Sequence, residues 1–298
     1  MAKLLLYLNL IRWNNILLLL FCQILFKYQV FPYFKSTSLL SNFEFILLLI
    51  SVICIAAGGY IINDIFDVKC DKINKPKKVY IPKLINLKTA KLYYVSTTGL
   101  GLLFGSTVCI LTGNAIHIIT YLIVIILLYT YSLSFKRTAL IGNFITAALV
   151  SFNLILLLLL DSNFNQSNKA VHLTLLFSLF SFLINFLREI IKDIEDVNGD
   201  YNSGFKTLPI IIGNNRTVKF VLGFSIIPLY FLLNFGIYEL NKRYVIQIFY
   251  WLFIVSTFFL FIYKTCSAIS KPHFSFISKL LKWILIFGLI LIFLMTYA

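Results

Sequence analysis

Negative charge is scarce in this sequence. Only 11 of the 298 residues are Asp or Glu, against 26 Lys or Arg, and charged residues of both signs make up 12% of the chain. An ordinary soluble domain carries about twice that share of charge. Together with the 60% apolar composition, this shortage excludes a typical soluble globular domain. We attribute the net charge of +15 to basic residues that face membrane lipid headgroups, and we expect no nucleic acid partner.

The sequence also lacks the cysteine patterns of metal and disulfide sites. Its five cysteines are scattered, and none forms a C-x-x-C pair or lies at a Cys/His ligand spacing. We therefore expect neither a zinc site nor a disulfide framework. The first apolar run has no small-residue cleavage site and continues to transmembrane length, so we interpret it as a membrane span rather than a signal peptide.

Long apolar runs dominate what is present. Runs of about 20 apolar residues, long enough to cross a bilayer core, recur along the whole chain. We predict an all-α polytopic membrane protein that forms a single domain over residues 1–298. The predicted spans are 14–33, 43–62, 93–112, 115–134, 139–160, 171–190, 218–237, 244–264 and 280–297.

The distribution of basic residues predicts the orientation. With the N-terminus in the cytoplasm, 21 of the 26 basic residues fall on the cytoplasmic side and 5 on the outer side. We expect an integral protein of the cell inner membrane with a cytoplasmic N-terminus. Two acidic motifs, at residues 63–71 and 192–200, are then expected on the cytoplasmic side as well.

Eight of the eleven acidic residues lie in or directly beside two short motifs. The first motif reads N-D-I-F-D-V-K-C-D, and its residues at four-residue spacing are Asn63, Asp67 and Asp71. The second reads K-D-I-E-D-V-N-G-D, and the same spacing separates Asp196 from Asp200, with Asp193 three residues before Asp196. Residues four apart share one face of a helix, so each motif is expected to present a row of oxygen ligands.

Such rows of acceptors at the edge of an apolar segment are costly unless a cation binds them. Mg2+ prefers hard oxygen ligands and usually binds through carboxylates and phosphate oxygens. A single pair of acids at this spacing is often only a solvated helix end. Two matching pairs on one predicted side favour a shared Mg2+ site that binds a diphosphate. Further phosphate contacts are expected from the basic residues near the motifs, which are Lys75, Lys77, Lys78, Arg188, Lys192 and Lys206.

The motifs resemble the two signatures of the UbiA-type intramembrane prenyltransferases. Asn63, Asp64, Asp67 and Asp71, followed by Asn-Lys-Pro at 74–76, resemble the first signature. The run R-E-I-I-K-D-I-E-D-V-N-G-D at 188–200, followed by G-F-K-T-L-P at 204–209, resembles the second. The resemblance extends to Arg12 with Asn15, to Tyr131-Ser132 with Lys136, and to Gly142-Asn143.

The resemblance implies nine transmembrane helices around a central cavity. It implies that both motifs bind a polyprenyl diphosphate through Mg2+, and that the diphosphate ionises to an allylic carbocation, which an acceptor captures. The implied catalytic residues are Asp67, Asp71, Asp196 and Asp200. The implied metal ligands are Asn63, Asp64, Asp67, Asp71, Asp193, Asp196 and Asp200. The implied substrate contacts are Arg12, Asn15, Asn63, Tyr131, Arg188, Lys192 and Lys206.

The second motif is most similar to the branch that prenylates geranylgeranylglyceryl phosphate in ether-lipid synthesis. An aromatic acceptor for quinone synthesis, such as 4-hydroxybenzoate or homogentisate, is the alternative. The remaining partners expected are membrane lipids.

Two other classes of membrane protein also place acids in or near spans. A CDP-alcohol phosphotransferase is disfavoured because D-G-x-x-A-R does not follow the first acids. An ion-coupled transporter is the alternative that is not an enzyme, and its acids are expected nearer the bilayer centre.

Overall fold

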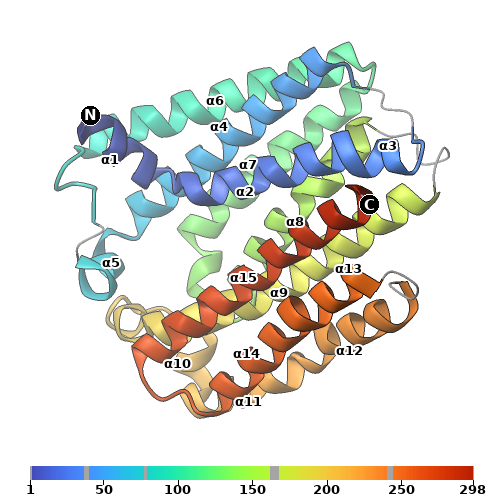
Figure 1. Ribbon diagram of the computed structural model, residues 1–298. Coiled ribbons are helices and arrows are strands. Elements are labelled where there is room, and N and C mark those ends of the chain that lie inside the picture. Colours follow the sequence, from blue (N-terminus) through green and yellow to red (C-terminus); the bar gives the residue numbers. More distant parts are fainter. Residues whose placement is uncertain (1, 37–39, 77–78, 162–167, 240–243, 298) are drawn as a thin grey trace. The chain divides into compact units, whose positions relative to one another are not determined.

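The structure is a computed structural model that describes residues 2–36, 40–76, 79–161, 168–239 and 244–297 (Figure 1). The chain divides into two compact units. The first unit comprises residues 1–136 and 153–172, and the second comprises residues 137–152 and 173–298. The assignment of residues 1–298 to one domain stays a prediction.

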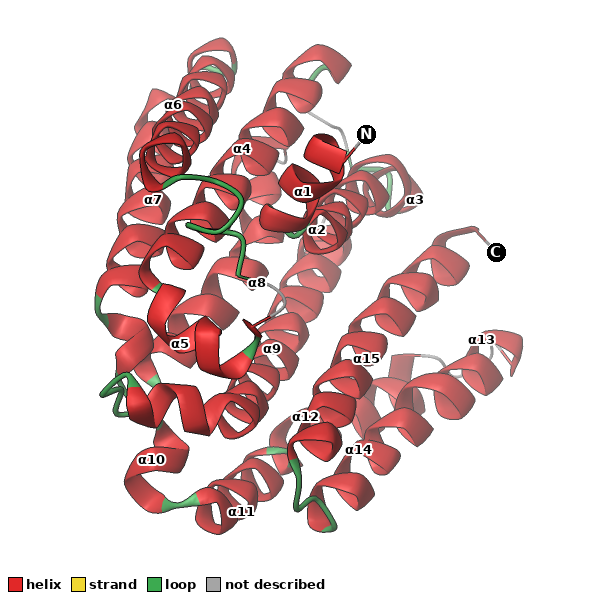
Figure 2. Ribbon diagram, turned by 90° about the vertical axis from the view of Figure 1, so that its left-hand side faces the viewer, coloured by secondary structure: helices red, strands yellow, loops and turns green. Residues whose placement is uncertain are grey.

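The prediction of an all-α membrane protein is confirmed. The described residues are almost entirely helical, and they include nine helical segments long and apolar enough to cross a membrane (Figure 2). These segments are Trp13–Tyr33, Asn42–Phe66, Leu87–Leu111, Ala115–Leu133, Ile141–Asp161, Lys169–Asn202, Asn214–Ile237, Tyr244–Cys266 and Lys271–Tyr297.

Several helices extend beyond the predicted spans. The second span continues to Phe66 and therefore contains Asn63 and Asp64, while the sixth continues to Asn202 and contains the whole second motif. The ninth begins at Lys271 instead of residue 280. Hydropathy detects only the apolar part of a helix, whereas the backbone hydrogen bonds that define the helix continue through polar residues.

The first unit contains the first acidic motif. Its helices include α1 (Ala2–Leu10), α2 (Trp13–Leu25), η1 (Phe26–Val30), α3 (Phe31–Tyr33), α4 (Asn42–Phe66), α5 (Val68–Asn74), α6 (Leu87–Leu111), η3 (Ala115–His117) and α7 (Ile118–Leu133). Helix α8 (Ile141–Asp161) and helix α9 (Asn168–Asn202) each contribute residues to both units.

Close packing of α4 against α6 organises the first unit (Figure 1). The hydroxyl of Ser51 donates a 2.7 Å hydrogen bond to the carbonyl oxygen of Gly101. A Cβ atom at Gly101 would lie only 3.0 Å from the backbone nitrogen of Ile55. Glycine is therefore needed at position 101 for the two backbones to approach one another.

The second unit contains the second motif. Its helices after α9 are α10 (Leu208–Ile212), α11 (Asn214–Phe224), α12 (Ile226–Asn234), η5 (Phe235–Glu239), α13 (Tyr244–Phe249), η6 (Tyr250–Val255), α14 (Ser256–Cys266) and α15 (Lys271–Tyr297).

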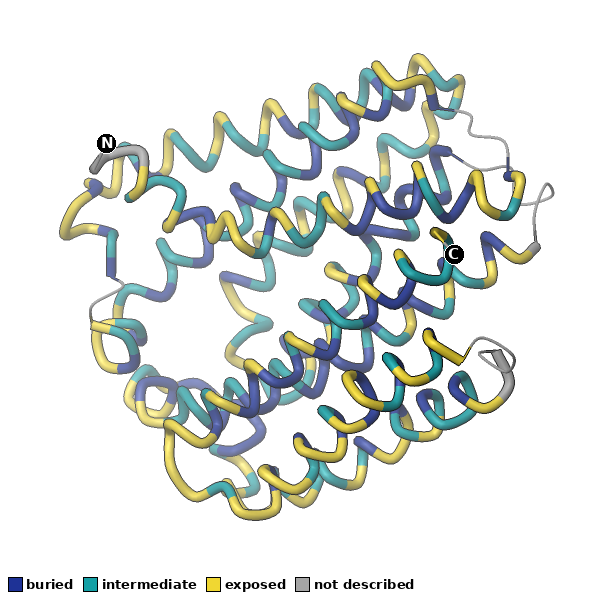
Figure 3. The backbone as a smooth tube through the Cα atoms, viewed as in Figure 1, coloured by how far each residue is buried: buried dark blue, intermediate teal, exposed yellow. Residues whose placement is uncertain are grey.

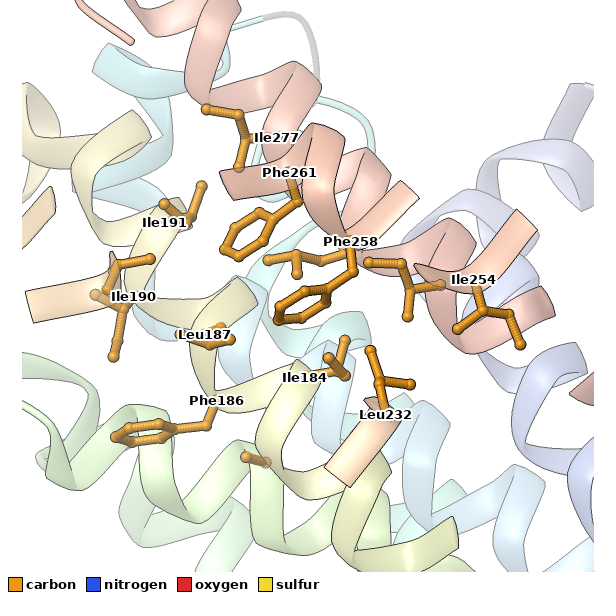
Figure 4. Packing of buried hydrophobic residues seen from close by; sticks show 14 of the residues in the cluster. Ile184, Phe186, Leu187, Ile190, Ile191, Leu232, Ile254, Phe258, Phe261 and Ile277 are labelled. Carbon is orange, nitrogen blue, oxygen red and sulfur yellow. The ribbon is translucent and has the colours of Figure 1, made fainter. Parts of the chain in front are cut away.

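The core of the second unit is built on α9. Ile184, Leu187 and Ile191 of that helix pack in one buried cluster with Phe258 of α14 and Ile277 of α15 (Figure 4). Exposed residues alternate with buried ones along most helices (Figure 3). Many of the exposed residues are large and apolar, as expected for helices whose outer faces contact lipid.

Candidate functional site

The first motif lies where α4 ends and α5 begins. Asp67 separates the two helices, but the four-residue hydrogen-bond pattern continues through it. The amide of Asp67 donates to the carbonyl of Asn63 at 2.9 Å, and the amide of Asp71 donates to the carbonyl of Asp67 at 2.8 Å. The helical spacing predicted for Asn63, Asp67 and Asp71 is therefore present in the backbone.

The side chains of Asn63 and Asp67 are buried and contact each other. Nδ2 of Asn63 donates a 2.6 Å hydrogen bond to Oδ2 of Asp67. Asp67 is 3% exposed. A buried carboxylate needs compensating positive charge, and Lys136 of η4 (Phe135–Arg137) provides it by donating to the same Oδ2 atom.

Lys136 remains protonated in this environment. Burial by itself disfavours the ammonium, but the charge of Asp67, followed by that of Tyr131, outweighs burial and raises the pKa of Lys136 above its ordinary value. Tyr131 therefore lies close to the Lys136–Asp67 pair in the first unit. Sequence reasoning assigned no role to Lys136, although it had placed Lys136 within a segment that resembles the family.

The negative charge of Asp71, in the first motif, is only partly compensated by its surroundings. Its pKa is raised, first by burial and next by the negative charge of Asp67, while Lys136 and Lys75 oppose the rise. A divalent cation would reverse this balance because it stabilises the ionised carboxylate. The donor set of the first motif therefore fits Mg2+.

Arg12 binds the remaining acid of the first motif. It adopts a left-handed backbone conformation with φ 54° between α1 and α2. Its guanidinium lies 2.9 Å from Oδ1 of Asp64 and 4.9 Å from the ring centre of Tyr60. Asn15 lies one turn further on, and its amide donates to the carbonyl of Arg12 at 2.8 Å. The predicted residues Arg12 and Asp64 are thus brought together.

The second motif lies in one uninterrupted helix, α9. Oδ2 of Asp193 accepts a 2.8 Å hydrogen bond from Nδ2 of Asn143, which comes from α8. Oδ1 of Asp196 lies 4.0 Å from Nζ of Lys271, and Asp200 is 5% exposed. Asn143 belongs to the Gly142-Asn143 segment that resembles the family, and the structure makes it a direct partner of the predicted ligand Asp193.

The loop after α9 turns back to the start of the second unit. Gly204 has φ 74°, a conformation that favours glycine, and the amide of Phe205 donates to the carbonyl of Asp200 at 2.9 Å. The amide of Lys206 then donates to the carbonyl of Arg137 at 2.8 Å, while its side chain is exposed. Of the other lysines expected near phosphate, Lys77 and Lys78 lie outside the described residues.

Arg188 lies one turn before the second motif and Lys192 is the first residue of that motif, and both side chains converge on one carboxylate of α9. Oε1 of Glu189 lies 3.2 Å from Nη1 of Arg188 and accepts a 2.6 Å hydrogen bond from Nζ of Lys192. The predicted substrate contacts Arg188 and Lys192 therefore belong to one cluster.

Each unit thus brings its own predicted site residues together. Within the described parts of the chain, no group of three or more His, Cys, Asp or Glu side chains is already arranged to hold a metal ion. That the two motifs share one Mg2+ site stays a prediction.

Comparison with known proteins identifies the class. Residues 30–280 match the model of the UbiA prenyltransferase family. The chain belongs to this family and is a membrane-embedded prenyltransferase, which sets aside both the transporter and the phosphotransferase alternatives.

Several relatives have a name that is more specific than that of the family. A digeranylgeranylglyceryl phosphate synthase from Sulfolobus acidocaldarius is 31% identical over 78% of this chain and 80% of its own length. One from Methanosphaera stadtmanae is 31% identical over 81% of this chain and 84% of its own length. A solved structure described as that of digeranylgeranylglyceryl phosphate synthase in membranes is 28% identical, with a TM-score of 0.68 over 98% of both chains. A UbiA homologue from Archaeoglobus fulgidus, bound to DMAPP and Mg2+, shares the fold at 18% identity, with a TM-score of 0.63 over 96% of this chain and 98% of its own.

Proposed function

We propose that this prenyltransferase transfers a polyprenyl group from polyprenyl diphosphate to geranylgeranylglyceryl phosphate, with Mg2+ as its cofactor. The main structural support for this proposal is the buried carboxylate of Asp67, which contacts both Asn63 and Lys136. This pairing supports an acidic site that binds cations. The acceptor is supported by the relatives named digeranylgeranylglyceryl phosphate synthase.

The metal would be held by Asn63, Asp64, Asp67 and Asp71 of the first motif and by Asp193, Asp196 and Asp200 of the second. When bound, Mg2+ neutralises the diphosphate and makes it a better leaving group. The protein prepares the ligands through their neighbours. Asn63 fixes the orientation of the Asp67 carboxylate, and Asn143 does the same for Asp193.

Positive side chains complete the proposed diphosphate site. Lys136 already lies at the first motif as an ammonium, and Lys271 lies beside Asp196. Each lysine could exchange its carboxylate partner for a phosphate oxygen of the substrate, because ammonium groups bind carboxylates and phosphates alike. The aromatic and aliphatic residues of the spans provide an apolar environment for the isoprenoid tail.

A transfer assay on the purified protein tests the acceptor. Labelled geranylgeranyl diphosphate and Mg2+ are supplied with geranylgeranylglyceryl phosphate, 4-hydroxybenzoate or homogentisate in separate reactions. We expect a prenylated glycerol phosphate that is lost with EDTA and in the Asp196→Ala variant. Glu195→Ala is the matched control because it removes the adjacent carboxylate of the same helix. Product with an aromatic acceptor alone would refute the proposed acceptor.

We also propose that the N-terminus and both acidic motifs face the cytoplasm. The support is the excess of lysine and arginine in the connections assigned to that side. Mg2+ would then reach the site directly from the cytoplasm.

A further inference from the structure

In the second unit, α15 runs antiparallel to α9, and two contacts define how the helices are aligned. Near the start of α15, Nζ of Lys271 lies 4.0 Å from Oδ1 of Asp196. Further along, a Cβ atom at Gly288 would lie 3.1 Å from the ring of Phe177. Residue numbers rise along α15 as they fall along α9, so Lys282 lies within about one helical turn of the level of Arg188.

Lys282 adds a third positive charge to the cluster on α9. It is half-buried within a membrane-spanning helix, and it lies close enough to Arg188 for the two charges to interact. Arg188 and Lys192 already share the carboxylate of Glu189. The four side chains therefore carry three positive charges and one negative charge. Charged side chains inside a membrane are expensive, and an excess of one sign is a reason to expect a ligand of the opposite sign.

The guanidinium of Arg188 also offers a free donor. Its Nη1 atom faces Glu189, whereas its Nε atom is buried and has no hydrogen-bond partner among the described residues. A buried donor without a partner costs stability. An oxygen of a bound anion would satisfy it, and guanidinium groups bind phosphate well because their N–H groups match its geometry.

We propose that Arg188, Lys192 and Lys282 bind the phosphate of the acceptor, and that Lys282 determines the preference for a phosphorylated acceptor. This inference rests on the proposed function and adds a specificity-determining residue to it. A phosphate monoester carries close to two negative charges at neutral pH, which matches the excess of two positive charges in the cluster.

Arg188 lies at the end of the cluster that is farther from the proposed diphosphate site. Arg188 precedes Asp196 by eight residues, or about 12 Å along the helix axis. The free hydroxyl of geranylgeranylglyceryl phosphate is on the carbon next to the one that bears its phosphate. A phosphate bound at the cluster would hold that hydroxyl between the cluster and the acidic motif, near the carbon that carries the diphosphate.

Steady-state kinetics of Lys282→Met test the inference. We expect the KM for geranylgeranylglyceryl phosphate to rise by about 10-fold or more, because a charge-assisted contact is lost. The KM for geranylgeranyl diphosphate should stay within about twofold of that of the unmodified protein, which also shows that the variant is folded. Lys282→Arg should restore most of the affinity. Lys279→Met is the matched control, because Lys279 is an exposed lysine on the same helix.

The preference between a phosphorylated and an unphosphorylated acceptor is an independent test of the inference. The unmodified protein should prefer geranylgeranylglyceryl phosphate to geranylgeranylglycerol, which lacks the phosphate, and Lys282→Met should reduce that preference by about the same factor. An unchanged KM and an unchanged preference in an active Lys282→Met variant would overturn the inference alone. If the unmodified protein transferred no prenyl group to geranylgeranylglyceryl phosphate, the proposed function would fail, and the assignment of the cluster with it.

Discussion

The ammonium of Lys136 and the amide of Asn63 donate to the same oxygen atom, Oδ2 of Asp67. Lysine therefore occupies a position at the carboxylate that a metal cation would need. Replacing Lys136 with Met should remove this competition, so Mg2+ alone should raise the thermal unfolding temperature of the variant more than that of the unmodified protein.

Prenyl transfer should nevertheless fall by about 10-fold or more in Lys136→Met, because a positive charge near the diphosphate is lost. Lys136→Arg should retain part of the activity. Equal stabilisation of both proteins by Mg2+ would show that Lys136 does not compete with the metal.

The acidic ligands should make Mg2+ binding sensitive to pH. The pKa of Asp71 is raised by burial and by the charge of Asp67, so Asp71 takes up a proton at a higher pH than an ordinary aspartate. Protonation removes a ligand charge, and the affinity for Mg2+ should therefore decrease as the pH is lowered through the raised pKa. Mg2+ titrations of diphosphate binding at several pH values measure this. Asp71→Asn should bind more weakly and with less dependence on pH; a variant with the same pH profile would exclude Asp71 as its source.

A buried ion pair stabilises the first unit. Nζ of Lys27 lies 3.2 Å from Oδ2 of Asp161, and their side chains are 3% and 0% exposed. Lys27 also donates to the carbonyl of Leu40 at 2.8 Å, while the amide of Leu40 donates to Oδ1 of Asp161 at 2.8 Å. Lys27→Met leaves Asp161 without this partner and should lower the free energy of unfolding by about 3–5 kcal/mol.

The double variant Lys27→Met with Asp161→Asn should recover most of that stability, because the charge is removed and an oxygen remains for the amide of Leu40. Lys35→Met, at an exposed lysine nearby, should change little. Thermal unfolding in detergent compares the four proteins. A double variant less stable than Lys27→Met would contradict the ion-pair explanation.

The proposed orientation predicts which cysteine is labelled from which side. Cys266 is exposed at the end of α14, whereas Cys22, Cys70 and Cys109 are buried. A membrane-impermeant maleimide should modify Cys266 in inverted vesicles but not in intact cells, and Cys266→Ser should remove the signal. Labelling of Cys266 in intact cells would contradict the proposed orientation and indicate the opposite one.

Much of the fold is predictable from the sequence because each span is a continuous apolar run. The ends of the spans are not predictable in this way. Helix α9 continues through the charged second motif to Asn202, where hydropathy falls but backbone hydrogen bonding continues. The two motifs stand out because acids are so rare elsewhere in the chain.

The partners of the site residues were harder to predict. Lys136 lies 69 residues from Asp67, and Asn143 lies 50 residues from Asp193. Lys27 and Asp161 are separated by 134 residues. Such pairs depend on which helices pack together, and hydropathy along one chain carries no information about that packing.

Mg2+-dependent binding of labelled geranylgeranyl diphosphate tests most directly whether both motifs serve one site. The unmodified protein, Asp67→Ala, Asp200→Ala and the control Glu195→Ala are compared in detergent with and without EDTA. We expect binding to weaken by at least about 100-fold in either aspartate variant, because each motif supplies ligands that the other cannot replace. Unchanged Mg2+-dependent binding in either Asp67→Ala or Asp200→Ala would contradict the shared site.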